Sequence, residues 1–214
     1  MNRRHLFGLA ALLPFAAPLS SGAWAATPPL SAQDRADIAR VERYLDTLKS
    51  LKSRFLQIAP DGSTSEGNAW LARPGRLRFE YDLPSPFLLV AGYGVVMFHD
   101  RKLQQTSSFP ISQTPLGILL SDKTKLSGDV TVGAVMRDPG LLQLSVFRTA
   151  NPGEGSLTLG FADNPLQLRQ WSVVDAQRME TRVTLFNIQL GERFDEKLFD
   201  VTDPRTGTSL APGR

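Results

Sequence analysis

Residues 76–82 read Arg-Leu-Arg-Phe-Glu-Tyr-Asp, so that charged and apolar side chains alternate along the chain. A period of two is typical of a strand with one buried face, because successive side chains point to opposite sides of a sheet. Leu77, Phe79 and Tyr81 form the apolar face. The stretch therefore predicts a half-buried strand whose inner face is rich in aromatic side chains.

Similar apolar runs continue through most of the chain on either side of this strand. Turn sequences such as Asp138-Pro139-Gly140 and Asn151-Pro152-Gly153 separate them, and short turns join antiparallel strands. About ten twisted strands in one sheet rarely stay flat. We predict a mainly β (α+β) protein with a single curled antiparallel sheet. Further strands are expected at Glu66–Ala72, Phe87–Ala91, Val95–His99, Leu103–Thr106, Leu126–Val132, Leu141–Arg148, Ser156–Phe161, Gln167–Val174 and Glu180–Leu190.

Two segments break the strand pattern and predict helices. Ser31 followed by Asp34 is a capping pair, and apolar residues then recur every three or four positions from Ile38 to Phe55. We expect one long N-terminal helix there, whose last residues also fit the start of a strand. Thr114-Pro115 places a capping residue before a proline, which favours a short internal helix. The apolar residues of that helix are Leu116, Ile118, Leu119 and Leu120.

The beginning of the chain predicts export from the cytoplasm. Arg3 and Arg4 precede an apolar run, and Ala23-Trp24-Ala25 has the small-x-small spacing that a signal peptidase cleaves. We expect a secretion signal over 1–25, a single domain over 26–204 and a flexible tail over 205–214. The paired arginines also fit twin-arginine export, and an uncleaved membrane anchor is the alternative. The mature chain is expected in the periplasm.

Composition excludes several classes of function. The chain has 24 Lys and Arg against 21 Asp and Glu, with no long run of like charges, so we expect no nucleic-acid partner. The absence of cysteine excludes thiol chemistry and disulfides, and only two histidines are present. The sequence contains no nucleophile elbow, phosphate-binding loop or His-Glu-x-x-His motif. We therefore expect no enzyme activity, no cofactor and no metal.

Two polar features are the remaining candidates for catalysis. Glu80 and Asp82 share one face of a strand and could resemble the paired carboxylates of a glycosidase. Arg76 and Arg78 beside them favour a solvated face instead. His99 precedes an apparent turn and is expected to be a surface histidine.

The apolar side chains of the strands leave two interpretations open. They either pack tightly against the two helices or line a cavity, since a barrel of about eight strands has room for a small ligand. Periodicity alone favours an ordinary core. The side chains concerned are Leu77, Phe79, Tyr81, Phe87, Leu89, Phe98, Phe147, Trp171 and Phe186.

The order of several short motifs resembles the family of periplasmic outer-membrane lipoprotein carriers, LolA. The similarity covers about residues 33–204 and departs from the family pattern at Gly92-Tyr93-Gly94 and at Phe199-Asp200-Val201. The matching motifs are Phe55 with Gln57, Gly67 with Trp70, 71–81 with its Arg73-Pro74 pair, Pro84 and Pro86 with the strand to Ala91, Phe98–Asp100, Gln104 or Gln105, Thr114-Pro115-Leu116 with Leu119-Leu120, and Leu198-Phe199.

The resemblance implies an unclosed β-barrel with a concave hydrophobic cavity lidded by helices. It also implies a carrier that accepts acylated lipoproteins from an inner-membrane ABC transporter and passes them to an outer-membrane receptor. Arg73 would lie at the cavity mouth and hold the lid closed through hydrogen bonds. The residues expected to form the cavity and lid are Arg73, Leu71, Leu77, Phe79, Tyr81, Leu89, Phe98, Leu116, Leu119 and Leu120.

We expect the mature protein to be a monomer. Two alternatives to a lipoprotein carrier are kept. One is a carrier or sensor of another lipid on the same fold, and the other is a secreted enzyme with an unrecognised site.

Overall fold

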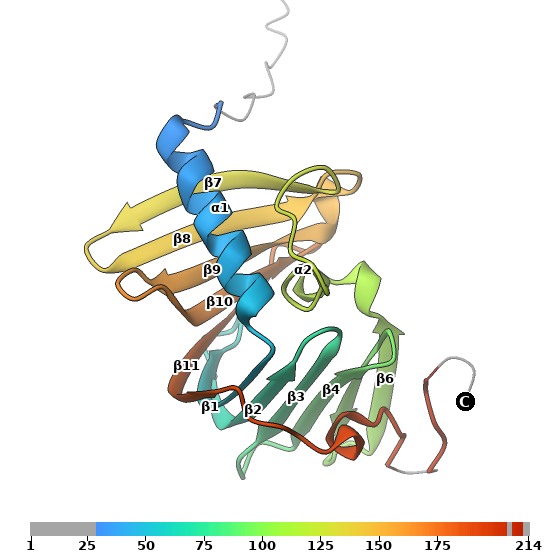
Figure 1. Ribbon diagram of the computed structural model, residues 1–214. Helices are drawn as coiled ribbons and strands as arrows, with labels where there is room; N and C mark the ends of the chain where they lie inside the picture. Colours follow the sequence, from blue (N-terminus) through green and yellow to red (C-terminus); the bar gives the residue numbers. More distant parts are fainter. Residues whose placement is uncertain (1–28, 205–206, 212–214) are drawn as a thin grey trace, which may run out of the picture.

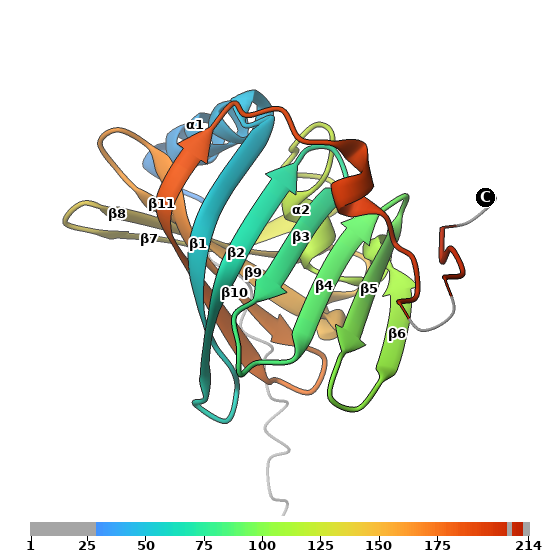
Figure 2. The same ribbon diagram turned by 90° about the horizontal axis from the view of Figure 1, so that it is seen from below.

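The computed structural model describes residues 29–204 and 207–211 and contains one sheet of 11 antiparallel strands (Figure 1). The strand order is β6-β5-β4-β3-β2-β1-β11-β10-β9-β8-β7. Strands β6 and β7 are the two edges of the sheet and do not pair with each other, so the curled sheet is an open half-barrel, as predicted (Figure 2). The predicted secretion signal lies outside the described residues. Among those residues, no helix has the length and apolar character needed to cross a membrane.

Consecutive strands pair as hairpins except β6 and β7, which lie at opposite edges, and the pairing of β1 with β11 joins the two halves of the sheet. The strands are β1 (Ser50–Ile58), β2 (Thr64–Ala72), β3 (Arg76–Tyr81), β4 (Phe87–Gly92), β5 (Val95–Asp100), β6 (Gln105–Pro110), β7 (Val130–Asp138), β8 (Leu141–Arg148), β9 (Gly155–Ala162), β10 (Gln167–Asp175) and β11 (Glu180–Leu190). The helical segments are α1 (Ala32–Thr47), α2 (Leu116–Leu119) and the 3₁₀ turns η1 (Ile111–Gln113), η2 (Pro152–Glu154) and η3 (Glu196–Phe199).

Helix α1 begins at the predicted capping pair but ends earlier than predicted. The Ser31 side chain accepts a hydrogen bond from the Asp34 N–H, and the Asp34 carboxylate accepts one from the Ser31 N–H. The apolar stripe continues past the helix because Leu51 and Phe55 are on strand β1. Their spacing of four residues fits a strand as well as a helix, since four is a multiple of two. The sequence therefore gave no clear boundary, and β1 was not predicted as a separate strand.

Helix α1 crosses the concave side of the half-sheet made by β7–β10 (Figure 1). Arg137 of β7 donates hydrogen bonds to Asp34 and Asp37, each at 2.7 Å. The Tyr44 hydroxyl accepts a hydrogen bond from the Leu168 N–H of β10 at 3.0 Å. These polar contacts fix the helix over an apolar interface, so that it covers one half of the barrel.

Two strands begin later than predicted. The turn before β6 includes Leu103, because the Asp100 carboxylate accepts hydrogen bonds from the N–H groups of Lys102 and Leu103. Strand β7 begins at Val130 rather than at Leu126, whose N–H donates to Glu42 of α1 at 2.7 Å. In both places a carboxylate side chain accepts the hydrogen bonds of backbone N–H groups that would otherwise bond to a neighbouring strand.

The short helix α2 forms where predicted, but its start differs in detail. Pro115 occupies the N-cap, and the Thr114 hydroxyl donates to the Ile111 carbonyl at 3.0 Å. Thr114 therefore closes the preceding turn η1 and does not cap α2. Ile118, Leu119 and Leu120 are buried against the concave side of the sheet.

The segment from 198 to 211, in its described part, lies across the outer face of β4 and β5 (Figure 2). Its Val201 and Ala211 form an apolar cluster with Leu88, Val90 and Met97. We call this segment the strap. Residues 207–211 of the predicted tail belong to it, and it explains why β4 and β5 are apolar on both faces.

The strap also buries a polar residue that was predicted to lie at the surface. His99 is only 3% exposed, and its Nδ1 lies 3.0 Å from the Thr106 hydroxyl, which donates to Asp203 of the strap at 3.1 Å. The prediction was wrong because the covering residues come from the far end of the chain. Gly92 lets the strap backbone pack closely on β4, since a Cβ added at Gly92 would lie 2.4 Å from the Phe199 carbonyl oxygen.

Candidate functional site

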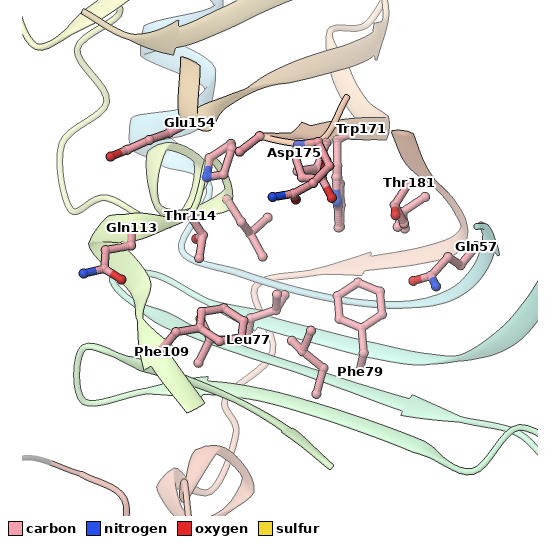
Figure 3. A pocket seen from close by; sticks show the side chains of 18 of the residues that line it. Gln57, Leu77, Phe79, Phe109, Gln113, Thr114, Glu154, Trp171, Asp175 and Thr181 are labelled. Atoms are coloured by element: carbon pink, nitrogen blue, oxygen red, sulfur yellow. Dashed lines mark hydrogen bonds between the residues drawn. The ribbon is translucent and has the colours of Figure 1, made fainter. Parts of the chain in front are cut away.

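A cavity of about 560 Å³ opens between the concave face of the sheet and the segment around α2 (Figure 3). This volume lies in the ~300–1,000 Å³ range of small-molecule sites. Strands from both halves of the barrel contribute to its walls. The apolar lining is Leu77, Phe79, Leu89, Val96, Phe109, Leu116, Trp171, Val173 and Val183, with Tyr81 among them.

The wall is held in place by a chain of edge-to-face aromatic contacts. The Phe79 ring lies 4.5 Å from Phe55 and 5.9 Å from Trp171, measured between ring centroids. Tyr81 continues the chain with Phe55 at 5.1 Å, and its hydroxyl donates to Gln57 Oε1 at 2.7 Å. Burial raises the pKa of Tyr81 to about 12. Such geometry suits a rigid apolar surface.

Polar side chains lie at both ends of the cavity, with Gln57 and Thr181 at one end and Gln113 and Glu154 at the other, more exposed end, which we call the mouth (Figure 3). Gln113, Glu154 and Gln177 are exposed there. Glu154 accepts a hydrogen bond from Asn151, and Asp175 accepts from backbone N–H groups of its own turn. These carboxylates stabilise turns, and no acid–base pair faces the cavity among them. The arrangement is suited to binding an apolar group whose polar end remains in water.

Residues 111–126, which contain η1, α2 and the turn after them, cover the cavity on one side. We call them the lid segment. The buried Arg73 guanidinium donates to the Ser121 carbonyl through Nη2 at 2.6 Å and Nε at 3.2 Å, and through Nη2 to the Thr124 hydroxyl at 2.6 Å. Burial lowers the pKa of Arg73 from its usual value, against the opposing attraction of Asp46 and Asp122. The side chain nevertheless stays a cation.

Helix α1 and the backbone after Arg73 hold the same segment. Asp46 accepts a hydrogen bond from the Thr124 N–H at 2.9 Å, and Glu42 accepts from Leu126. The Gly75 N–H donates to the Leu120 carbonyl at 2.8 Å. The lid segment is therefore attached through polar bonds at its C-terminal end, while its N-terminal end continues from β6.

The structure separates the predicted site residues into three groups. Leu77, Phe79, Tyr81, Leu89 and Leu116 line the cavity. Leu71, Leu119 and Leu120 are buried in the apolar core, and Phe98 lies 5.2 Å from Phe87 between ring centroids. Arg73 lies behind the lid segment and not among the cavity residues.

Several cavity residues were not predicted. Phe109 lies near the end of β6 and Gln113 follows that strand, in a stretch with little apolar periodicity. Val183 alternates with polar residues on β11, and Val173 lies two residues after Trp171 on β10. These patterns indicate one face of a strand but do not indicate a cavity. Trp171, which was predicted only as core or cavity, reaches the wall from the second half of the sheet.

The polar residues weighed for catalysis have structural partners. Glu80 pairs with Arg78 at 3.1 Å, and Asp82 pairs with Arg54 at 2.5 Å. His99 is bonded to Thr106 under the strap. Among the described residues, no group of His, Asp and Glu side chains is arranged to hold a metal ion.

Comparison with known proteins assigns the chain to a family. The family model described as outer membrane lipoprotein carrier protein LolA matches residues 46–202, well over half of the chain. The chain belongs to the LolA family. The matched region includes the cavity strands, Arg73 and the lid segment, and it ends within the strap.

LolA-family relatives match over most of their own length. The outer-membrane lipoprotein carrier protein of Methylococcus capsulatus is 27% identical over 176 residues, covering 78% of this chain and 83% of that protein. The one of Azotobacter vinelandii is 26% identical over 203 residues, covering 90% and 95%. Among solved structures, a LolA superfamily protein of Nitrosomonas europaea covers 80% of this chain and 98% of its own, with a TM-score of 0.40 and 10% identity.

Proposed function

We propose that the chain is a periplasmic carrier that shields the acyl chains of lipoproteins and moves them from the inner to the outer membrane. The observation that carries this proposal is an apolar, aromatic-walled cavity under a lid segment, in a chain of the LolA family. The role is one of binding, and it requires no catalytic residue, cofactor or metal.

The physical need for such a carrier is simple. Each buried methylene contributes ~0.8 kcal/mol to membrane binding, so a multiply acylated protein does not leave a bilayer unaided. A cavity lined by Leu, Val, Phe and Trp side chains offers a comparable environment. A carrier must also release its cargo, so its affinity has to match that of the membrane rather than greatly exceed it.

Opening and closing of the lid segment would set that affinity. In the closed form, α2 covers the cavity and Arg73 donates to Ser121 and Thr124 behind it. We propose that Arg73 acts as a latch for the empty state. The partners in this proposal are an inner-membrane ABC transporter that loads the carrier and an outer-membrane receptor that unloads it.

The site of action gives a first prediction. The mature protein is expected to begin at Ala26 and to occur in the periplasmic fraction, because Ala23-Trp24-Ala25 fits signal peptidase. N-terminal sequencing of the fractionated protein measures this directly. A chain that keeps Met1 in the cytoplasm would contradict the transport proposal.

The cargo gives a second prediction. Protein purified from the periplasm is expected to carry acylated protein, which native mass spectrometry followed by denaturing analysis identifies. A Phe79→Glu variant prepared in parallel controls for unspecific capture. Recovery of free lipid alone would support a carrier or sensor of another lipid on the same fold. Turnover of a periplasmic substrate by the wild type but not by this variant would instead favour an enzyme.

A further inference from the structure

The two ends of the open sheet differ in how well they are protected. Edge strands expose unpaired backbone groups, and proteins usually blunt them with bulges, charges or a covering element. Strand β7 has such protection: its pairing with β8 shifts register between Val132 and Ala134, and Arg137 near its end is ion-paired to α1. Strand β6 pairs with β5 over six residues without a register shift and carries no charged side chain.

The backbone groups that β6 leaves free can be assigned from its register. The Ile111 N–H donates to the Gly94 carbonyl at 2.9 Å, so every second residue back along β6 bonds to β5. The N–H and C=O groups of Thr106 and Ser108, with the Pro110 carbonyl, therefore point away from the sheet. Pro110 fits this register, since a proline is tolerated where the N–H would face solvent.

This edge leads directly to the cavity mouth. Phe109, near the end of β6, is 39% exposed and lines the cavity, and Gln113 follows it on the rim. Ser107, Ser108 and Pro110 are exposed as well. The strap reaches β6 only through Thr106 among the bonds of the described residues. A chain leaving the mouth would therefore meet a strand edge whose own residues are mostly exposed in the described part of the structure.

We infer that the free edge of β6 binds the extended peptide that follows the acylated residue of the cargo. This inference rests on the proposed carrier function and adds a second, peptide-binding surface to it. With the acylated residue at the mouth beside Phe109, the peptide runs toward Gln105 and pairs antiparallel with β6. Main-chain bonds give such strand addition its affinity without demanding a particular sequence, which suits a carrier of many lipoproteins.

The test compares two synthetic ligands on the wild-type chain. One is an acylated amino-acid amide, and the other carries the same acyl group followed by six Ala and Ser residues. The longer ligand is expected to bind about tenfold more tightly. A few backbone hydrogen bonds to β6 would give this gain after the conformational entropy lost by the ordered peptide is subtracted. Methylating alternate linker amides should abolish this gain in one register and leave it intact in the other.

Variants of Ser108 provide the matched control. Ser108→Pro removes an outward N–H and should eliminate the linker gain while leaving binding of the acyl amide unchanged. Ser108→Ala keeps the N–H and should retain the full gain. A longer ligand that binds no better than the amide, or equal effects of both methylation registers, would overturn the inference while the carrier function stands.

Two further outcomes are distinguishable. If the acyl amide itself does not bind to the wild type, the proposed carrier function fails, and the edge inference fails with it. If sedimentation shows a ligand-free dimer that Ser108→Pro dissociates, the β6 edge pairs with a second copy and does not bind cargo.

Discussion

Phe79→Glu is expected to reduce lipoprotein binding by more than about tenfold while the chain still folds. The Phe79 side chain lines the cavity and contacts Trp171 across it, so a carboxylate there would face the acyl chains. Desolvating that charge on ligand binding is unfavourable by several kcal/mol. Without ligand, water can enter the cavity and hydrate the carboxylate. We therefore expect the melting temperature to fall by only about 5–10 °C, as a loss of ~2–3 kcal/mol would give.

Phe55→Glu is the matched control, because it makes the same change on the same face of the sheet. The two rings are in contact, but Phe55 is 0% exposed and does not line the cavity. A carboxylate at Phe55 would be buried without water, so this variant should fail to fold. Circular dichroism and lipopeptide binding measure both variants. If Phe79→Glu unfolds as Phe55→Glu does, Phe79 belongs to the core and the cavity has been misplaced.

The sheet was largely predictable because the sequence signals of its strands and turns lie within short stretches of the chain. Alternation over 76–82, proline and glycine turns, and the capping pair at Ser31 gave the strands and the start of α1. Boundaries failed where side chains bond to backbone over long separations, as Glu42 does with Leu126. They also failed where a spacing fits two periods, as between Leu51 and Phe55.

The cavity was only partly predictable because periodicity assigns a face and not the depth of packing. Leu71 and Leu77 alternate in the same way, pair across β2 and β3 and are both fully buried, yet only Leu77 lines the cavity. The pattern of one strand does not tell these two positions apart. The burial of His99 is a second case, since strand position says nothing about a strap from the other end of the chain.

Arg73→Leu is expected to leave loading with lipoprotein intact and to lower its transfer to the receptor by about tenfold or more. Arg73 makes charged hydrogen bonds to Ser121 and Thr124 in the closed form, and such bonds contribute about 1.5–3 kcal/mol each. Leucine removes them and therefore destabilises the closed, empty carrier. This change favours the loaded carrier, and 1.4 kcal/mol shifts the transfer equilibrium tenfold.

Two control variants separate the latch from other effects of the substitution. Arg43→Leu makes the same change at an exposed position of α1 and should transfer normally. Thr124→Val removes one acceptor of the Arg73 guanidinium and should show a smaller transfer defect of the same kind. Loading is measured after incubation with donor membranes, and transfer is measured by adding receptor to the loaded carrier. Poor loading by Arg73→Leu with normal transfer of what is bound would mean that Arg73 supports the fold of the lid segment and does not act as the latch.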